Sequence, residues 1–198
     1  MKLSKLGALI KEQKSVTVLN TVADEQIIRQ HILLYGAMYP MDGYPLLDKD
    51  VLLTILDIPK EKRGDYFYKE ENHTESTLRW AEDNPLNADT EAELLMTTIK
   101  LPMETLIPVR TVKGIVYIHA DYMQPIRDES ETEYFYRQLP QGGVIVAKKG
   151  WQTIATIATA KGWATETIAN ELQDIAQSAA EISQQLKKER QEAVQQMF

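Results

Sequence analysis

Apolar residues near the C-terminal end of the chain recur with the period of a helix that packs on another helix. From Thr165 to Phe198 no proline or glycine interrupts the segment, and good helix formers fill it. The pattern predicts one long helix over 161–198. Its apolar stripe joins two copies in a homodimer, meets a partner helix, or packs on the chain's own sheet. The contact residues expected for association are Ile168, Leu172, Ile175, Ile182 and Leu186.

The N-terminal half has a hairpin pattern followed by a short helix pattern. Residues 15–21 alternate, residues 26–34 are β-branched and apolar, and the four residues between them can turn the chain, so we expect a β-hairpin. Further along, Asp48 precedes one apolar helical face and Pro59 ends it, which predicts a short capped helix. The apolar spacing in residues 3–10 suits either a short amphipathic helix or a lead-in strand.

Two more hairpins are predicted in the C-terminal half, each with a Lys–Gly turn. If Lys113–Gly114 and Lys149–Gly150 are two-residue turns, the flanking strands bring apolar residues opposite each other. The expected cross-strand pairs are Val109 with Ile118 and Ile145 with Ile154.

Together these elements predict an α+β fold: a mainly antiparallel sheet of hairpins with short helices and one long C-terminal helix. The expected organisation is an α+β domain over 1–160 and the long helix over 161–198. A chain of 198 residues, 43% hydrophobic and 26% charged, has the composition of an ordinary globular protein.

Charge and cysteine content narrow the function classes. A formal net charge of −7 argues against general affinity for nucleic acid, because phosphate binding needs clustered lysine and arginine. We therefore expect nucleic acid to be involved only indirectly. The chain has no cysteine, which excludes disulfides, thiolate nucleophiles and cysteine-based zinc sites. No apolar run has the length of a signal peptide or of a membrane span, so the expected location is cytoplasmic, without a membrane partner.

His119 and Asp121 are the candidate catalytic pair. Two residues apart on a strand, they would share one face and could bind a metal or act as base and acid. The same alternation is typical of any solvated sheet face. No phosphate-binding glycine loop or nucleophile motif accompanies them, so the sequence indicates no cofactor and no dedicated metal site, and it favours a non-enzymatic role. The alternative is a small metal-dependent nuclease or hydrolase that uses these two residues.

Tyrosines and acidic residues are the candidate binding groups. Tyrosine offers rigid contact area with a polar tip, and a negative surface steers association with a basic one. The structural alternative is that the tyrosines close the sheet and the acidic residues only solubilise loops. The expected binding residues are Tyr39, Tyr44, Glu129, Glu131 and Glu133, and the expected partner is a protein with a basic surface.

The segments Tyr39–Leu47 and Leu52–Pro59 resemble small, uncharacterised accessory proteins carried by phages and other mobile elements of Gram-positive bacteria. No catalytic motif is part of this resemblance. It implies a cytoplasmic accessory protein that binds and modulates a host protein. Inhibition of a nucleic-acid-targeting defence system, anti-CRISPR activity included, suits that context.

Overall fold

The computed structural model of the chain describes residues 1–74, 89–95 and 97–160, together with residues 168, 170, 174, 181–183 and 185–186. The chain divides into two units, residues 1–159 and residues 160–198. None of the described helices is long and apolar enough to cross a membrane.

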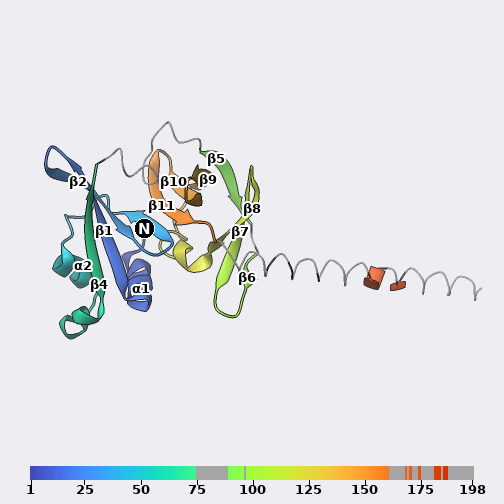
Figure 1. The fold of residues 1–198 in the computed structure, drawn as a ribbon, viewed down its shortest axis with the longest axis horizontal. Coiled ribbons are helices and arrows are strands. Elements are labelled where there is room, and N and C mark those ends of the chain that lie inside the picture. The colour runs from blue at the N-terminus through green and yellow to red at the C-terminus, as the bar shows by residue number, and fades with distance from the viewer. Residues whose placement is uncertain are drawn as a thin grey trace, which may run out of the picture. The chain divides into compact units, whose positions relative to one another are not determined.

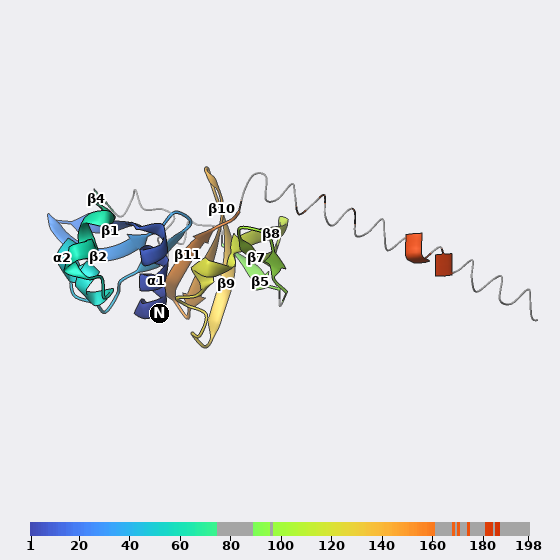
Figure 2. The ribbon, with the colours of Figure 1, turned by 90° about the horizontal axis from the view of Figure 1, so that it is seen from below.

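The first unit is built on a sheet of 11 strands. The order is β4-β1-β2-β3-β11-β10-β9-β5-β7-β6, with β8 paired to β7. β4 runs parallel to β1 and all other described pairs are antiparallel, so the sheet is mixed. Both views show β1, β2 and β4 on one side, β9, β10 and β11 in the middle, and β7 and β8 on the other side (Figures 1 and 2). The strands are β1 (Ser15–Ala23), β2 (Gln26–Leu33), β3 (Ala37–Pro40), β4 (Phe67–His73), β5 (Thr90–Leu94), β6 (Ile99–Lys100), β7 (Thr105–Thr111), β8 (Gly114–His119), β9 (Thr132–Leu139), β10 (Gly142–Lys149) and β11 (Gln152–Ala158).

Two short α-helices and two 3-10 helices accompany the sheet among the described residues of this unit. They are α1 (Leu3–Gln13), α2 (Lys49–Ile55), η1 (Lys60–Asp65) and η2 (Ala120–Met123). The side chain of Asp48 accepts a hydrogen bond from the amide of Val51 at 2.8 Å, which confirms the predicted cap of α2. Of the two conformations open for residues 3–10, the helix is the one observed. Both helices contribute fully buried leucines to one core that they share with the strands.

The predicted N-terminal hairpin is confirmed as β1 and β2. Its turn residues, Asp24 and Glu25, both have positive φ, at 48° and 62°. Positive φ at both central positions is the geometry whose twist matches the flanking strands. The backbone of this turn is therefore somewhat strained, since neither residue is glycine.

A buried amide pair on this hairpin fixes the segment that leads to α2. Gln30 and Asn20 lie opposite each other on β2 and β1, and both side chains are buried. The Gln30 amide donates to Asn20 Oδ1 at 2.9 Å and to the Leu47 carbonyl at 3.1 Å, and it accepts from the Leu47 amide at 2.6 Å. Asn20 donates in turn to Glu70 on β4 at 2.6 Å. The network satisfies buried polar groups and ties α2's lead-in segment to the sheet.

The registers of the two Lys–Gly hairpins differ from the predicted ones. Val109 lies opposite Val116 because the two-residue turn is Val112–Lys113. Thr111 selects that turn: its hydroxyl accepts from the Lys113 amide and donates to the Gly114 carbonyl. The partner of Val109 thus moves by two positions, from Ile118 to Val116, and each side chain stays on its predicted face.

In the last hairpin, Ile145 lies opposite Ile157 instead of Ile154. The turn is Gly150–Trp151, which moves the partner by two positions, and a bulge at Ala147/Lys148 adds one more. The prediction placed the turn one residue too early and had no signal for the bulge.

The predicted fold class is wrong. The described chain is mostly one large mixed sheet with a few short helices, where we expected a mainly antiparallel sheet of hairpins and one long C-terminal helix. The parallel pairing of β1 with β4 makes the sheet mixed. The helix predicted over 161–198 lies largely outside the described residues, and the described residues there form no long helix. Leu172 and Ile175 lie outside them; Ile168 is buried, and Ile182 and Leu186 are exposed.

Candidate functional site

A groove with exposed aromatic side chains lies at one end of the β4-β1-β2 part of the sheet. We call it the aromatic groove. Its volume is about 570 Å³, and it is lined by Gln13, Lys14, Ser15, Thr17, Leu33, Leu34, Tyr35 and Phe67. Phe67 is 61% exposed and Tyr35 is 82% exposed.

Strand order places the two aromatic residues on opposite sides of the groove. Ser15 and Thr17 on β1 have short side chains and contribute to its lining. Phe67 begins β4, directly opposite Ser15, whereas Tyr35 follows β2 in the turn to β3. Because β4 and β2 flank β1 and neighbouring strands lie about 4.8 Å apart, the strands that carry the walls are separated by about 10 Å. That width suits the side chain of a partner.

The chemistry of the aromatic groove suits binding. Among the described lining residues, Lys14 alone is charged at neutral pH, and it ends α1 in a left-handed conformation with φ of 50°. Its neighbours in the lining supply apolar area, hydroxyls and an amide. Such a surface can take up an apolar or aromatic group and give it a few polar contacts. Sequence reasoning placed Phe67 only in an aromatic strand; its exposure follows from the alternation of Tyr66, Phe67 and Tyr68, of which the middle residue faces outward.

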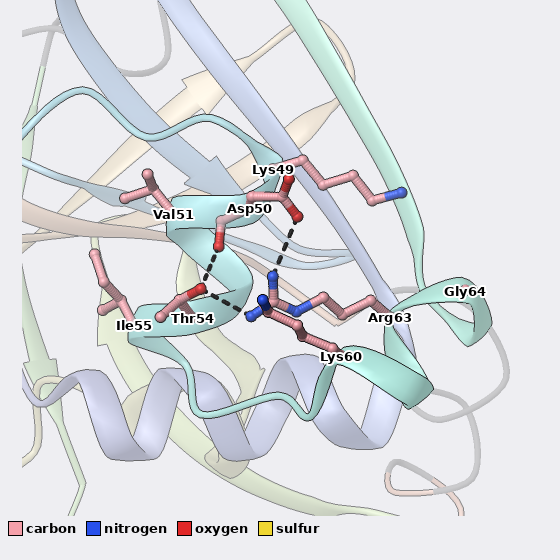
Figure 3. A pocket seen from close by; sticks show the side chains of 8 residues that line it. All are labelled: Lys49, Asp50, Val51, Thr54, Ile55, Lys60, Arg63 and Gly64. Carbon is pink, nitrogen blue, oxygen red and sulfur yellow. Dashed lines mark hydrogen bonds and ion pairs between the residues drawn. The ribbon is translucent and has the colours of Figure 1, made fainter.

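A second pocket, which we call the cationic pocket, lies between α2 and η1 (Figure 3). Its volume is about 810 Å³, and its lining residues are Lys49, Asp50, Val51, Thr54, Ile55, Lys60, Arg63 and Gly64. Arg63 contacts α2 at two points: it donates to Thr54 Oγ1 at 2.8 Å and to Asp50 Oδ1 at 3.1 Å. Its Nε donates to the Ile58 carbonyl at 3.2 Å.

The candidate catalytic pair lies in a different setting from the predicted one. His119 ends β8, but Asp121 belongs to η2, so the two do not share a strand face. The carboxylate that pairs with His119 is Glu104, with 2.9 Å between Nδ1 and Oε2, and the ring of Tyr122 packs edge-on against the imidazole. Within the described part of the chain, no group of three or more His, Cys, Asp or Glu side chains is arranged to hold a metal. Glu104 was missed because only the β7–β8 pairing brings it to His119.

The two tyrosines predicted to bind a partner have different environments. Tyr39 on β3 is fully buried, and its hydroxyl donates to the Tyr122 carbonyl at 2.6 Å. Burial, together with the nearby Tyr122, raises the pKa of its phenol. Tyr44 is exposed in the loop that follows β3. Tyr44 is therefore accessible to a partner, and Tyr39 is a core residue.

The three predicted acidic residues are also distributed differently. Glu129 is half-buried and pairs with the N-terminal ammonium of Met1 at 2.5 Å and with Lys149 at 3.3 Å. The hydrogen bond from that ammonium lowers the pKa of Glu129. Glu131 is exposed with φ of 58°, and Glu133 is exposed on β9 opposite Lys148. Of these three residues, Glu131 and Glu133 thus present exposed carboxylates.

Comparison with known proteins finds no matching family model, no matching curated protein and no matching solved structure.

Proposed function

We propose that this chain is a non-catalytic accessory protein that binds and modulates a host protein, and that the aromatic groove is its contact surface. The observation that carries the proposal is the exposure of Tyr35 and Phe67 on the two sides of one groove. Inhibition of a nucleic-acid-targeting defence system is the specific activity that we propose for it, in line with the resemblance to accessory proteins of mobile elements.

Exposed aromatic residues that share a groove favour a binding role. Single exposed apolar residues are common on protein surfaces and need no explanation, but tyrosine and phenylalanine are enriched at interfaces. A groove lets a partner side chain lose its water on several sides at once, which is where the largest binding contributions arise. Tyrosine also loses few rotamers on binding.

The net charge of −7 defines the class of partner that we propose: a protein with a basic surface. Glu131 and Glu133 are exposed, so their charges remain available to steer such a protein toward the chain. Because these carboxylates are solvated, we assign them to the association rate, and we assign the affinity to the aromatic groove.

The test compares three forms of the protein in capture from a Gram-positive host lysate, followed by measurement of Kd with the purified captured protein. The first is the unchanged chain and the second is Tyr35→Ser/Phe67→Ser. The third, Trp151→Ser, is the matched control, since Trp151 is 96% exposed and lies in the β10–β11 turn, outside the groove.

Loss of one aromatic hot-spot residue costs about 2 kcal/mol, or about 30-fold in Kd. We therefore expect the double variant to bind at least 30-fold more weakly and Trp151→Ser to bind within about threefold of the unchanged chain. Equal binding by all three forms, or equal loss in both variants, would remove the aromatic groove as the contact surface.

A further inference from the structure

The cationic pocket concentrates positive charge in an acidic protein. Its lining includes Lys49, Lys60 and Arg63 against a single carboxylate, Asp50. Among the described lining residues the excess is two positive charges, in a chain whose formal net charge is −7. Like charges gathered in a concave site raise the local potential and attract anions.

Arg63 is held in place before any ligand arrives. Its side chain is only 15% exposed, and three hydrogen bonds fix it to the Ile58 carbonyl, the Thr54 hydroxyl and the Asp50 carboxylate. A guanidinium has five N–H donors. The three contacts found among the described residues do not use all of them, so donors remain for a ligand. A fixed guanidinium binds an oxyanion at a lower entropy cost than a mobile one.

The two lysines provide mobile charge at the same pocket. Lys49 comes from the first turn of α2 and Lys60 from the first turn of η1, and both side chains are exposed. Figure 3 shows the Lys60 and Arg63 side chains reaching toward Thr54 from the η1 side. A ligand at this point would therefore meet the Arg63 guanidinium and the Lys60 ammonium, whereas Lys49, whose side chain extends away from Thr54 in Figure 3, adds its charge from the rim of the pocket.

Apolar groups form the remaining wall. Val51 and Ile55 lie one helical turn apart on α2, both are half-buried, and both line the pocket. The volume of about 810 Å³ is in the range of small-molecule sites. The pocket thus combines a cationic end with an apolar wall.

We propose that the cationic pocket binds a small-molecule phosphate monoester whose organic part lies against Val51 and Ile55. A phosphate monoester carries close to two negative charges at neutral pH, which match the local excess, and its oxygens suit the planar donor fork of arginine. A carboxylate would neutralise only half of that excess. This site is separate from the aromatic groove, with which it shares no lining residue.

The test uses the full chain and three probes: adenosine monophosphate, inorganic phosphate and adenosine. Binding is followed by isothermal titration calorimetry at low salt and by the backbone amide resonances, among which Gly64 reports on the pocket lining. The variant is Lys49→Gln/Lys60→Gln. The matched control is Lys62→Gln, which removes one charge from the same 3-10 helix without touching the lining.

We expect saturable binding of adenosine monophosphate, weaker binding of phosphate and none of adenosine, with the Gly64 resonance shifting. Lys60 contributes roughly fivefold for a charge at about 4 Å in water, and the more distant Lys49 contributes roughly twofold, so the double variant should bind about tenfold more weakly. Lys62→Gln should stay within about twofold, and high salt should weaken binding further. Absence of binding, tight binding of adenosine, or equal affinity in the double variant would overturn the proposal; unfolding midpoints in urea verify that the variants are folded.

Discussion

Replacing Gln30 by alanine should destabilise the chain more than the same replacement of an exposed glutamine on the same strand. Gln30 makes three side-chain hydrogen bonds, to Asn20 and to both backbone groups of Leu47, a residue that is itself buried. Each bond contributes about 1 kcal/mol net, and a buried group left without a partner costs about 1–3 kcal/mol. Three bonds and one group left without a partner therefore give an expected loss of about 4–6 kcal/mol in the free energy of unfolding.

Urea denaturation followed by far-UV circular dichroism measures this loss directly. The matched control is Gln26→Ala, because Gln26 lies on the same strand, β2, and is exposed. Its replacement should change the free energy of unfolding by no more than about 0.5 kcal/mol. If Gln30→Ala costs less than about 1 kcal/mol, or no more than Gln26→Ala, the amide network does not hold the segment before α2.

Two further predictions concern a buried histidine and a glycine packed under a ring. Burial and the Arg29 charge lower the pKa of His31 to about 4, against the opposing effect of Asp42. As the pH falls, His31 is therefore protonated in the unfolded chain before it is protonated in the folded chain. The free energy of unfolding should therefore fall by about 3 kcal/mol as pH drops from about 6.5 to about 4. Urea titrations of His31→Leu should show a weaker dependence of this free energy on pH, and an unchanged dependence would contradict the assignment to His31. Gly143→Ala would bring its Cβ within 2.5 Å of the Tyr136 ring, which is buried, and should cost about 1–3 kcal/mol. Gly64→Ala, with nothing within 4 Å of the new Cβ, should leave Tm unchanged, and equal effects of the two glycine changes would refute the packing argument.

Local signals predicted the elements whose determinants lie within a few residues. Asp48 caps α2 because its side chain reaches the amide of Val51, three residues on. The β1–β2 hairpin followed from the alternation in residues 15–21, the β-branched and apolar residues 26–34, and the short turn between them. The turn between β7 and β8 was displaced by one residue because the Thr111 hydroxyl stabilises a position that the glycine alone does not specify. Glycine marks where a turn is allowed, whereas side-chain contacts decide where it forms.

The long-range pairing that makes the sheet mixed had no signal of this kind. Ser15 pairs with Phe67 across the whole N-terminal segment, and the strands run parallel. Parallel partners need a long crossover, here through β2, β3 and α2, and nothing in either strand identifies the other. The aromatic groove depends on this pairing, since it brings Phe67 next to Ser15. Predicting the groove therefore required the topology and not only the residue types.

Tyr35 and Tyr39 show why residue type alone did not identify the binding residues. Tyr39 lies on β3, between β2 and β11, where the core covers it and its hydroxyl finds the Tyr122 carbonyl. Tyr35 occupies the turn just before β3, next to Gly36, and a Cβ at Gly36 would lie 2.6 Å from the Tyr122 ring. Because that ring covers the inner side of the turn, the neighbouring tyrosine is left on the outside. The burial of Tyr39 and the exposure of Tyr35 thus both depend on Tyr122. A tyrosine can bind a partner only where the fold leaves its side chain exposed.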